Sequence, residues 1–407
     1  TRRSSRSRGR RNHIVFHVDT MDRRLSKLIS KQADPHAAGG DGLDSLLLAM
    51  GSTRAAARPP PRAARTVGVG EAVWDPAPPA QIAPQPSVRA SATASPALEL
   101  LRRRAMRRLQ AGAEAALERT LGAELLATLP VHSRATLRNG NGLVERWCMC
   151  RHLARHLAPD HVHAEPLLPP PYRREAEVPD LARELRDAGA APAQASKACR
   201  QLGLEAQKAL QWLVHQPPPT ATKVSVGAAA PGVAPGGGGG GGGTTTMMQV
   251  RAGSVALPLT RAHHDKLREL HDRAAARGGG GGDFRGALFS LLLRYDSLGG
   301  DGFQAALNAN AFGVLRRRFG VDFECFASPL NCRYDRFCSA FADVDAPFGS
   351  CGSFFDAFAL PPAAPPPEGC YEANPPFVPA LVEAMARRMN ALLTAADGSR
   401  RALGFIV

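Results

Sequence analysis

The sequence predicts an α/β fold in which a parallel sheet follows a layer of helices. Two observations lead to this prediction. Apolar residues recur at helical spacing from Ser95 onward, with arginines between them, and from about residue 284 short strand-like runs alternate with amphipathic helices. Because such alternation is typical of parallel sheets, ligands are expected beyond the carboxyl ends of the strands.

Residues 1–94 form a basic, proline-rich region for which we predict low-complexity disorder. It opens with Thr1-Arg-Arg-Ser-Ser-Arg-Ser-Arg-Gly-Arg-Arg11 and continues through stretches rich in proline. Such a segment cannot bury enough apolar surface to offset the entropy of the chain. The opening run fits a nuclear localisation signal or a loose RNA contact, but arginine-serine runs are also common low-complexity sequence.

Residues 95–215 are predicted to form an α-helical domain. Leucine and alanine recur at helical spacing from Leu98 to Leu126, and further helices are expected at 143–157, 180–187 and 194–215. The arginines between Arg102 and Arg108 form a basic face that could meet phosphates, although a solvated charged face is the usual explanation.

One cluster in this domain has donor atoms suited to zinc, but it lacks the spacing of a structural site, in which a loop separates the ligand pairs. We therefore predict no metal site here. The cluster comprises Cys148, Cys150, His152, His156, His161 and His163.

Residues 216–248 combine Pro217-Pro-Pro219 with a glycine run from Gly236 to Gly243, which indicates a flexible linker or an insertion. The sheet is expected in residues 249–407. Its predicted strands are 249–256, 321–326, 369–373 and 403–407, and its predicted helices are 259–277, 287–295, 311–319, 333–341 and 378–393.

The formal charge of +15, carried mostly by arginine, favours a polyanionic partner such as nucleic acid, although a GC-rich genome would also produce many arginines. The 8 cysteines are scattered without a disulfide framework, which favours a cytosolic or nuclear protein with reduced thiols. No run of about 18 apolar residues is present, so no membrane partner is expected.

The motif Asn374-Pro-Pro-Phe377 directly follows a predicted strand and precedes an amphipathic helix. The Asn374 side-chain oxygen and the Pro375 carbonyl could accept hydrogen bonds from both hydrogens of an adenine amine, which helps the nitrogen attack a methyl donor. Pro376 stiffens the loop, and Phe377 offers a face on which a base can stack. A rigid strand-to-helix turn is the structural alternative.

Several segments, in this order, resemble the cap-specific adenosine N6-methyltransferase family, also called the phosphorylated-CTD-interacting factor family. They are Leu291-Leu-Leu-Arg-Tyr295, Gly302-Phe-Gln-Ala-Ala306, Phe323-Glu-Cys-Phe-Ala-Ser-Pro-Leu-Asn-Cys332, Phe337-Cys-Ser-Ala-Phe341, Phe348-Gly-Ser350 and Glu372-Ala-Asn-Pro-Pro-Phe377. The resemblance covers residues 285–407.

This resemblance implies a Rossmann-like S-adenosylmethionine-dependent methyltransferase domain over 249–407, C-terminally incomplete because the chain stops where a sheet should continue. Capped mRNA would be the substrate, the phosphorylated RNA polymerase II C-terminal domain a second partner, and the nucleus the location. The implied catalytic residues are Asn374, Pro375, Pro376 and Phe377, and the implied substrate-binding residues are Arg294, Tyr295 and Phe377.

S-adenosylmethionine is the implied cofactor, although Ala-Ser-Pro-Leu-Asn replaces the usual Gly-rich first loop. Asp343 or Asp345 would hold its ribose hydroxyls or, alternatively, act as turn and capping residues. The implied cofactor-binding residues are Ala327, Ser328, Pro329, Leu330, Asn331, Asp343, Asp345, Phe348, Gly349 and Ser350.

The chain also departs from the family, because Trp74, Trp147 and Trp212 lie too far apart to form a WW module. Two alternatives therefore remain. One is a catalytically inactive adaptor that binds RNA or the polymerase tail. The other is an adenine or glutamine N-methyltransferase with a different substrate.

Overall fold

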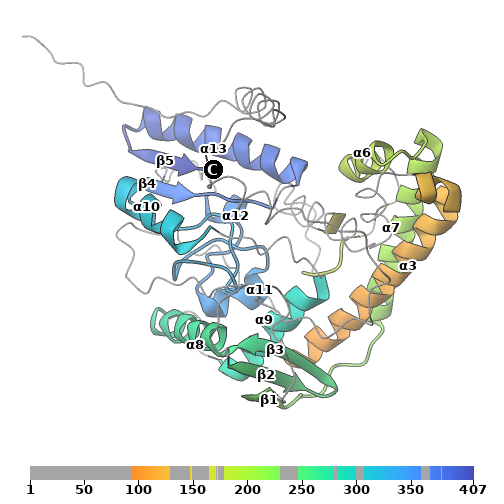
Figure 1. Ribbon diagram of the computed structural model, residues 1–407, viewed down its shortest axis with the longest axis horizontal. Helices are drawn as coiled ribbons and strands as arrows, with labels where there is room; N and C mark the ends of the chain where they lie inside the picture. The colour runs from red at the N-terminus through yellow and green to blue at the C-terminus, as the bar shows by residue number, and fades with distance from the viewer. Residues whose placement is uncertain are drawn as a thin grey trace, which may run out of the picture. The chain divides into compact units, whose positions relative to one another are not determined.

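The computed structural model describes residues 94–128, 147–148, 165–170, 172, 178–229, 246–278, 282–298, 307–358, 367–376 and 378–407 (Figure 1). All described residues belong to one compact unit, residues 63–407. The region predicted to be disordered lies outside the described residues except for Ala94, and so does Phe377.

Three helices follow Ser95: α3 (Pro96–Thr128), α6 (Pro179–Asp187) and α7 (Pro192–Val214). They confirm the helices predicted from Ser95, at 180–187 and at 194–215, while most of 143–157 lies outside the described residues. The long helix α3 is interrupted at Gly122, whose φ of 77° is outside the helical range. It packs along α7 and α9.

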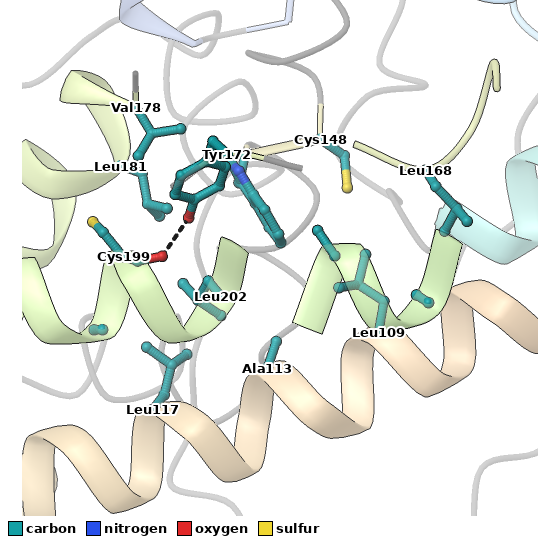
Figure 2. Close-up of a cluster of buried hydrophobic side chains, with 14 of the residues drawn as sticks. Leu109, Ala113, Leu117, Cys148, Leu168, Tyr172, Val178, Leu181, Cys199 and Leu202 are labelled. Atoms are coloured by element: carbon teal, nitrogen blue, oxygen red, sulfur yellow. Dashed lines mark hydrogen bonds between the residues drawn. The ribbon is translucent and has the colours of Figure 1, made fainter. Parts of the chain in front are cut away.

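The apolar faces of α3 and α7 form one core, because leucine and alanine on each helix recur at a spacing that brings them to a single side. In Figure 2, Leu117 and Ala113 of α3 face Leu202 of α7. Tyr172 closes the top of this core, and its hydroxyl donates a hydrogen bond of 2.7 Å to the Cys199 carbonyl oxygen.

A three-stranded antiparallel sheet comes next, in the order β1 (Val224–Ala228), β2 (Met247–Ala252) and β3 (Val255–Thr260). Two predictions are corrected here. The segment predicted as a linker contains β1, and the single strand predicted at 249–256 is a hairpin that turns at Gly253 with a φ of 57°. Pairing with β2 fixes the short β1, whose own sequence signal is weak.

Helices α8 (Arg261–Ala276), α9 (Phe284–Leu298) and α10 (Ala309–Phe319) confirm the helices predicted for these segments. Thr260 and Asn308 cap the first turns of α8 and α10, because each side-chain oxygen accepts a backbone N–H. Helix α9 packs on the antiparallel sheet, and its apolar side chains from Leu288 to Leu293 are fully buried.

The rest of the chain contains short elements and two paired strands. They are α11 (Ala342–Asp345), the 3-10 helix η3 (Ala346–Phe348), α12 (Phe354–Ala357), β4 (Gly369–Glu372), α13 (Pro379–Gly398) and β5 (Leu403–Ile406). Strands β4 and β5 run parallel, and α13 lies alongside them (Figure 1).

Three parallel bridges extend this pairing. Ser350, Phe337, Glu324 and Glu372 lie on neighbouring segments in this order, and β5 follows beyond β4. We number the segments along the chain: Glu324 lies on the first, Phe337 on the second and Ser350 on the third, and β4 and β5 are the fourth and fifth. In space they lie side by side in the order third, second, first, fourth, fifth. The helix predicted at 333–341 is wrong, because parallel pairing of Phe337 with Glu324 overrides the local helical pattern.

An aromatic and aliphatic core joins these segments to α13. Phe323, Phe358 and Tyr371 pack edge to face, with ring centroids 5.1 to 6.0 Å apart. Leu392 and Met389 of α13 belong to the same core. The described residues are thus a mixed helix and sheet structure, as predicted. None of the helices described combines the length and the apolar character that crossing a membrane requires.

Candidate functional site

The carboxyl ends of the parallel segments meet at one edge, and most of the residues predicted to form a site lie there. Backbone hydrogen bonds tie the segments together just before this edge, from Ala327 N–H to the Cys338 carbonyl at 2.8 Å and from Cys351 N–H to the Phe337 carbonyl at 2.7 Å. The Ser339 and Ser350 hydroxyls hydrogen-bond at 2.6 Å and join the second and third segments.

The Ala327–Asn331 loop leaves the first segment as a tight turn. Ser328 donates to the Asn331 side-chain oxygen from its backbone N–H at 2.7 Å and from its hydroxyl at 3.0 Å. Buried Lys266 of α8 donates to the carbonyls of Leu330 at 3.3 Å and Cys332 at 2.7 Å. These polar side chains hold the turn in shape, so a ligand at this loop would meet mainly its backbone.

Two consecutive residues of α9 hold the two acidic residues of α11. The Arg294 guanidinium donates to both carboxylate oxygens of Asp343, at 3.0 and 2.7 Å. The Tyr295 hydroxyl donates to Asp345 Oδ2 at 2.9 Å, and the Phe341 backbone N–H donates to the same oxygen at 3.2 Å. The structure therefore brings four of the predicted site residues into one cluster.

The two carboxylates, Asp343 and Asp345, differ in their remaining capacity to accept hydrogen bonds. Both Asp343 oxygens are occupied by Arg294, whereas Asp345 Oδ1 is buried and lacks a hydrogen-bond partner among the described residues. Burial raises the pKa of Asp345 to about 7. For Asp343, burial alone would raise the pKa, but the charge and hydrogen bonds of Arg294 outweigh it and hold the pKa below its usual value.

Arg294 was predicted to bind substrate, yet its side chain is 0% exposed. Glu99 of α3 and Asp343 together occupy four of its N–H positions. Burial alone would lower its pKa, but Glu99 and Asp343 raise the pKa well above the usual value. This environment favours a structural role for Arg294, while Tyr295 is only partly buried.

The Asn374-Pro-Pro motif lies where the sequence predicts it, between β4 and α13. The Ala373 N–H donates to the Ile406 carbonyl at 2.8 Å, which anchors the loop to β5. Pro375 is buried, and Asn374 and Pro376 are half-buried. The Asn374 side chain thus remains partly open to solvent next to the carboxyl edge of the sheet.

A pair of buried glutamates next to this motif was missed by the sequence analysis. Glu324 and Glu372 lie directly opposite each other on neighbouring segments and are 3% and 4% exposed. Burial raises the pKa of both carboxyls, and the charge of Glu324 raises that of Glu372 further. The sequence signal that could have revealed this pair is a charged residue inside each of two short, otherwise apolar predicted strands. Because side chains alternate along a strand, Glu372 and Asn374 leave the same face.

Phe348 and Gly349 are buried beside Ser350, and Gly349 has a φ of 101°. No group of three or more potential metal ligands occurs in the part of the chain that the structure describes. Of the cysteine-histidine cluster, only Cys148 lies in that part, and its side chain is buried.

Comparison with known proteins supports the resemblance predicted from the sequence. Residues 266–407 match the family described as Phosphorylated CTD interacting factor 1 WW domain. The mouse mRNA (2′-O-methyladenosine-N(6)-)-methyltransferase is 36% identical over 164 residues, which are 39% of this chain and 22% of the relative. The human protein of the same name is 44% identical over 126 residues, or 30% and 16%.

These matches support the predicted resemblance over residues 266–407, and they span less than a quarter of the length of the curated relatives. The matched residues contain no tryptophan, because Trp74, Trp147 and Trp212 all precede them. The match therefore does not rest on a WW module, despite the family's description.

Proposed function

Because residues 266–407 match the phosphorylated-CTD-interacting factor family, we propose that this chain carries the catalytic centre of an mRNA (2′-O-methyladenosine-N6-)-methyltransferase. It would transfer a methyl group from S-adenosylmethionine to the N6 amine of the adenosine beside the cap. The observation that carries the proposal is the position of Asn374-Pro375 at the carboxyl end of β4, beside the first parallel segment.

The proposed fold of residues 249–407 is Rossmann-like. The five segments from Glu324 to β5 lie in the order third, second, first, fourth, fifth, which is the order of the doubly wound α/β fold, and all described pairings among these five segments are parallel. In that fold ligands bind where the order reverses, between the first and fourth strands. Glu324 lies on the first segment and Glu372 on the fourth, so the reversal falls between them and next to Asn374.

In the proposed mechanism the chain orients the amine and provides no covalent intermediate. The Asn374 side-chain oxygen and the Pro375 carbonyl accept the two amine hydrogens, which turns the nitrogen lone pair toward the methyl carbon. Rigid proline backbone fixes both acceptors, and alignment then accounts for much of the rate increase. Phe377 would stack on the adenine ring. Its side chain lies outside the described residues.

Among the described residues, Asp345 gives specific support for S-adenosylmethionine, as a partner for a ribose hydroxyl of the cofactor. A ribose hydroxyl donates to a carboxylate oxygen with free acceptor capacity, and in doubly wound folds that carboxylate lies about 20 residues from the start of the first loop. Asp345 meets this requirement through Oδ1, whereas Asp343 is fully engaged by Arg294. The bound cofactor supplies an activated methyl group, and the backbone of the Ala327–Asn331 loop and Phe348-Gly-Ser350 would line its site.

Capped mRNA is the proposed substrate, with the phosphorylated polymerase C-terminal domain as a second partner and the nucleus as the location. The formal charge of +15 supports polyanionic partners, and the basic run that opens the chain supports nuclear import.

The test is methyl transfer from labelled S-adenosylmethionine to a capped RNA that begins with 2′-O-methyladenosine. We expect label that depends on the cap and disappears in Asn374→Ala. Asn390→Ala is the matched control, because Asn390 is exposed on α13, and it should retain activity. A folded protein that binds the cofactor but labels no capped RNA would overturn the proposal in favour of the adaptor or of another amine substrate.

A further inference from the structure

A buried charge cluster lies where α3, α9 and α11 meet. It contains two arginines and three carboxylates, all at most 10% exposed at the side chain. We refer to it as the Arg294 cluster, and its members are Arg294, Arg102, Glu99, Glu165 and Asp343. Three of them, Glu99, Arg102 and Glu165, lie outside residues 266–407 that match the family.

Arg294 is the centre of this cluster, because its guanidinium forms a fork on each of two sides. Toward α3, Nε and Nη2 donate to the two Glu99 oxygens at 2.9 and 2.8 Å. Toward α11, Nη1 and Nη2 donate to the two Asp343 oxygens at 3.0 and 2.7 Å. A planar guanidinium with two bidentate partners has little freedom to rotate.

Glu99 is held in turn by Arg102, whose Nη1 donates to Glu99 Oε1 at 2.6 Å. Arg102 Nε also donates to both Glu165 oxygens at 3.1 Å, and the Leu167 backbone N–H donates to Glu165 at 3.0 Å. The first turn of α3 is therefore connected through a chain of charge-assisted hydrogen bonds to Asp343.

Asp343 belongs to the turn Phe341–Asp345, which also carries Asp345. Tyr295, the residue after Arg294, holds Asp345 through its hydroxyl, and the Phe341 ring packs against Tyr295 at 5.5 Å between centroids. Arg294 also lies over the same ring at 5.2 Å. A shift of the Arg294 guanidinium would therefore move both carboxylates of the turn.

We propose that Glu99 of α3 is a positioning residue for the cofactor site, because it fixes Arg294 and through it the Phe341–Asp345 turn. This inference rests on the proposed function, in which Asp345 accepts a ribose hydroxyl. It assigns the helical region a part in cofactor binding. Glu99 itself touches neither cofactor nor substrate.

The test compares Glu99→Gln with Asp296→Asn. Both replace a carboxylate by an amide where α3 meets α9, but Asp296 pairs with Arg103 at 2.8 Å, and among the described residues no hydrogen bond or ion pair joins Asp296 to the turn. We expect Glu99→Gln to raise the S-adenosylmethionine Kd and KM about tenfold, in the range for one member of a coupled network. The kcat at saturating cofactor should stay within about twofold of wild type, and Asp296→Asn should change neither constant.

Two further results make the outcome decisive. Glu99→Asp keeps the charge on a shorter side chain, so its cofactor affinity should lie between those of wild type and Glu99→Gln, and equal affinities of all three would overturn the positioning role. Hydrogen exchange at residues 341–345 should quicken in Glu99→Gln and not in Asp296→Asn. Wild-type protein that is folded yet neither binds S-adenosylmethionine nor transfers methyl would instead overturn the proposed function itself.

Discussion

Gly349, one of the predicted cofactor-binding residues, is expected to tolerate no side chain. Its φ of 101° lies in the region that residues with a Cβ rarely adopt. A Cβ built there would overlap the backbone carbonyl oxygen of Asp335, and Arg277 Nη2 would lie 3.3 Å away. That carbonyl already accepts from Arg277 at 3.2 Å, and the Asp335 carboxylate pairs with the same guanidinium at 2.7 Å.

The cost of Gly349→Ala follows from these contacts. The backbone conformation costs about 1–2 kcal/mol for a residue with a Cβ. Displacing the Asp335 carbonyl weakens a partly buried hydrogen bond from a charged donor and adds about 1–2 kcal/mol. We therefore expect a loss of about 3 kcal/mol in the free energy of unfolding, which corresponds to a fall in Tm of roughly 6–12 °C for a domain of this size.

Thermal unfolding followed by circular dichroism measures this change, with Gly398→Ala as the control. Gly398 is the last residue of α13, its φ is not positive, and an added Cβ meets no atom within 4 Å. The control should leave Tm unchanged or raise it slightly. A Gly349→Ala protein with a Tm within about 2 °C of wild type would refute the strain and overlap inferred at this turn.

Two other predictions concern the Asp345 carboxyl and the helical core. The folded pKa of Asp345, about 7, exceeds the unfolded value of about 3.9, so this group makes the fold less stable as pH rises from about 4 to 7. Asp345→Asn should flatten that decline in chemical denaturation, and an unchanged pH profile would contradict it. Leu202→Ala truncates a side chain that is 0% exposed and should cost about 2–5 kcal/mol by the same assay, whereas exposed Leu204→Ala should cost under about 1 kcal/mol.

The long helices and the position of the candidate site could be predicted because their signals are local. Helical spacing identified α3, α7 and α9, and the tetrapeptide after β4 identified the edge of the sheet. Segment 333–341 could not be assigned in this way, since its residues pair with Glu324 across the sheet and not with their own neighbours. The strand β1 was missed for the same reason.

The sequence by itself predicted which residues form a site, Asn374 from its motif and Asp343 and Asp345 from the family resemblance, because residue types and their order are properties of the chain. Only the tertiary structure decided how the two aspartates differ. Arg294 and Glu99, 195 positions apart, meet in one buried pair, and Arg294 also donates to both oxygens of Asp343, whereas Asp345 Oδ1 has no hydrogen-bond partner among the described residues. Burial and charge pairing depend on contacts between distant segments, and no local pattern encodes them.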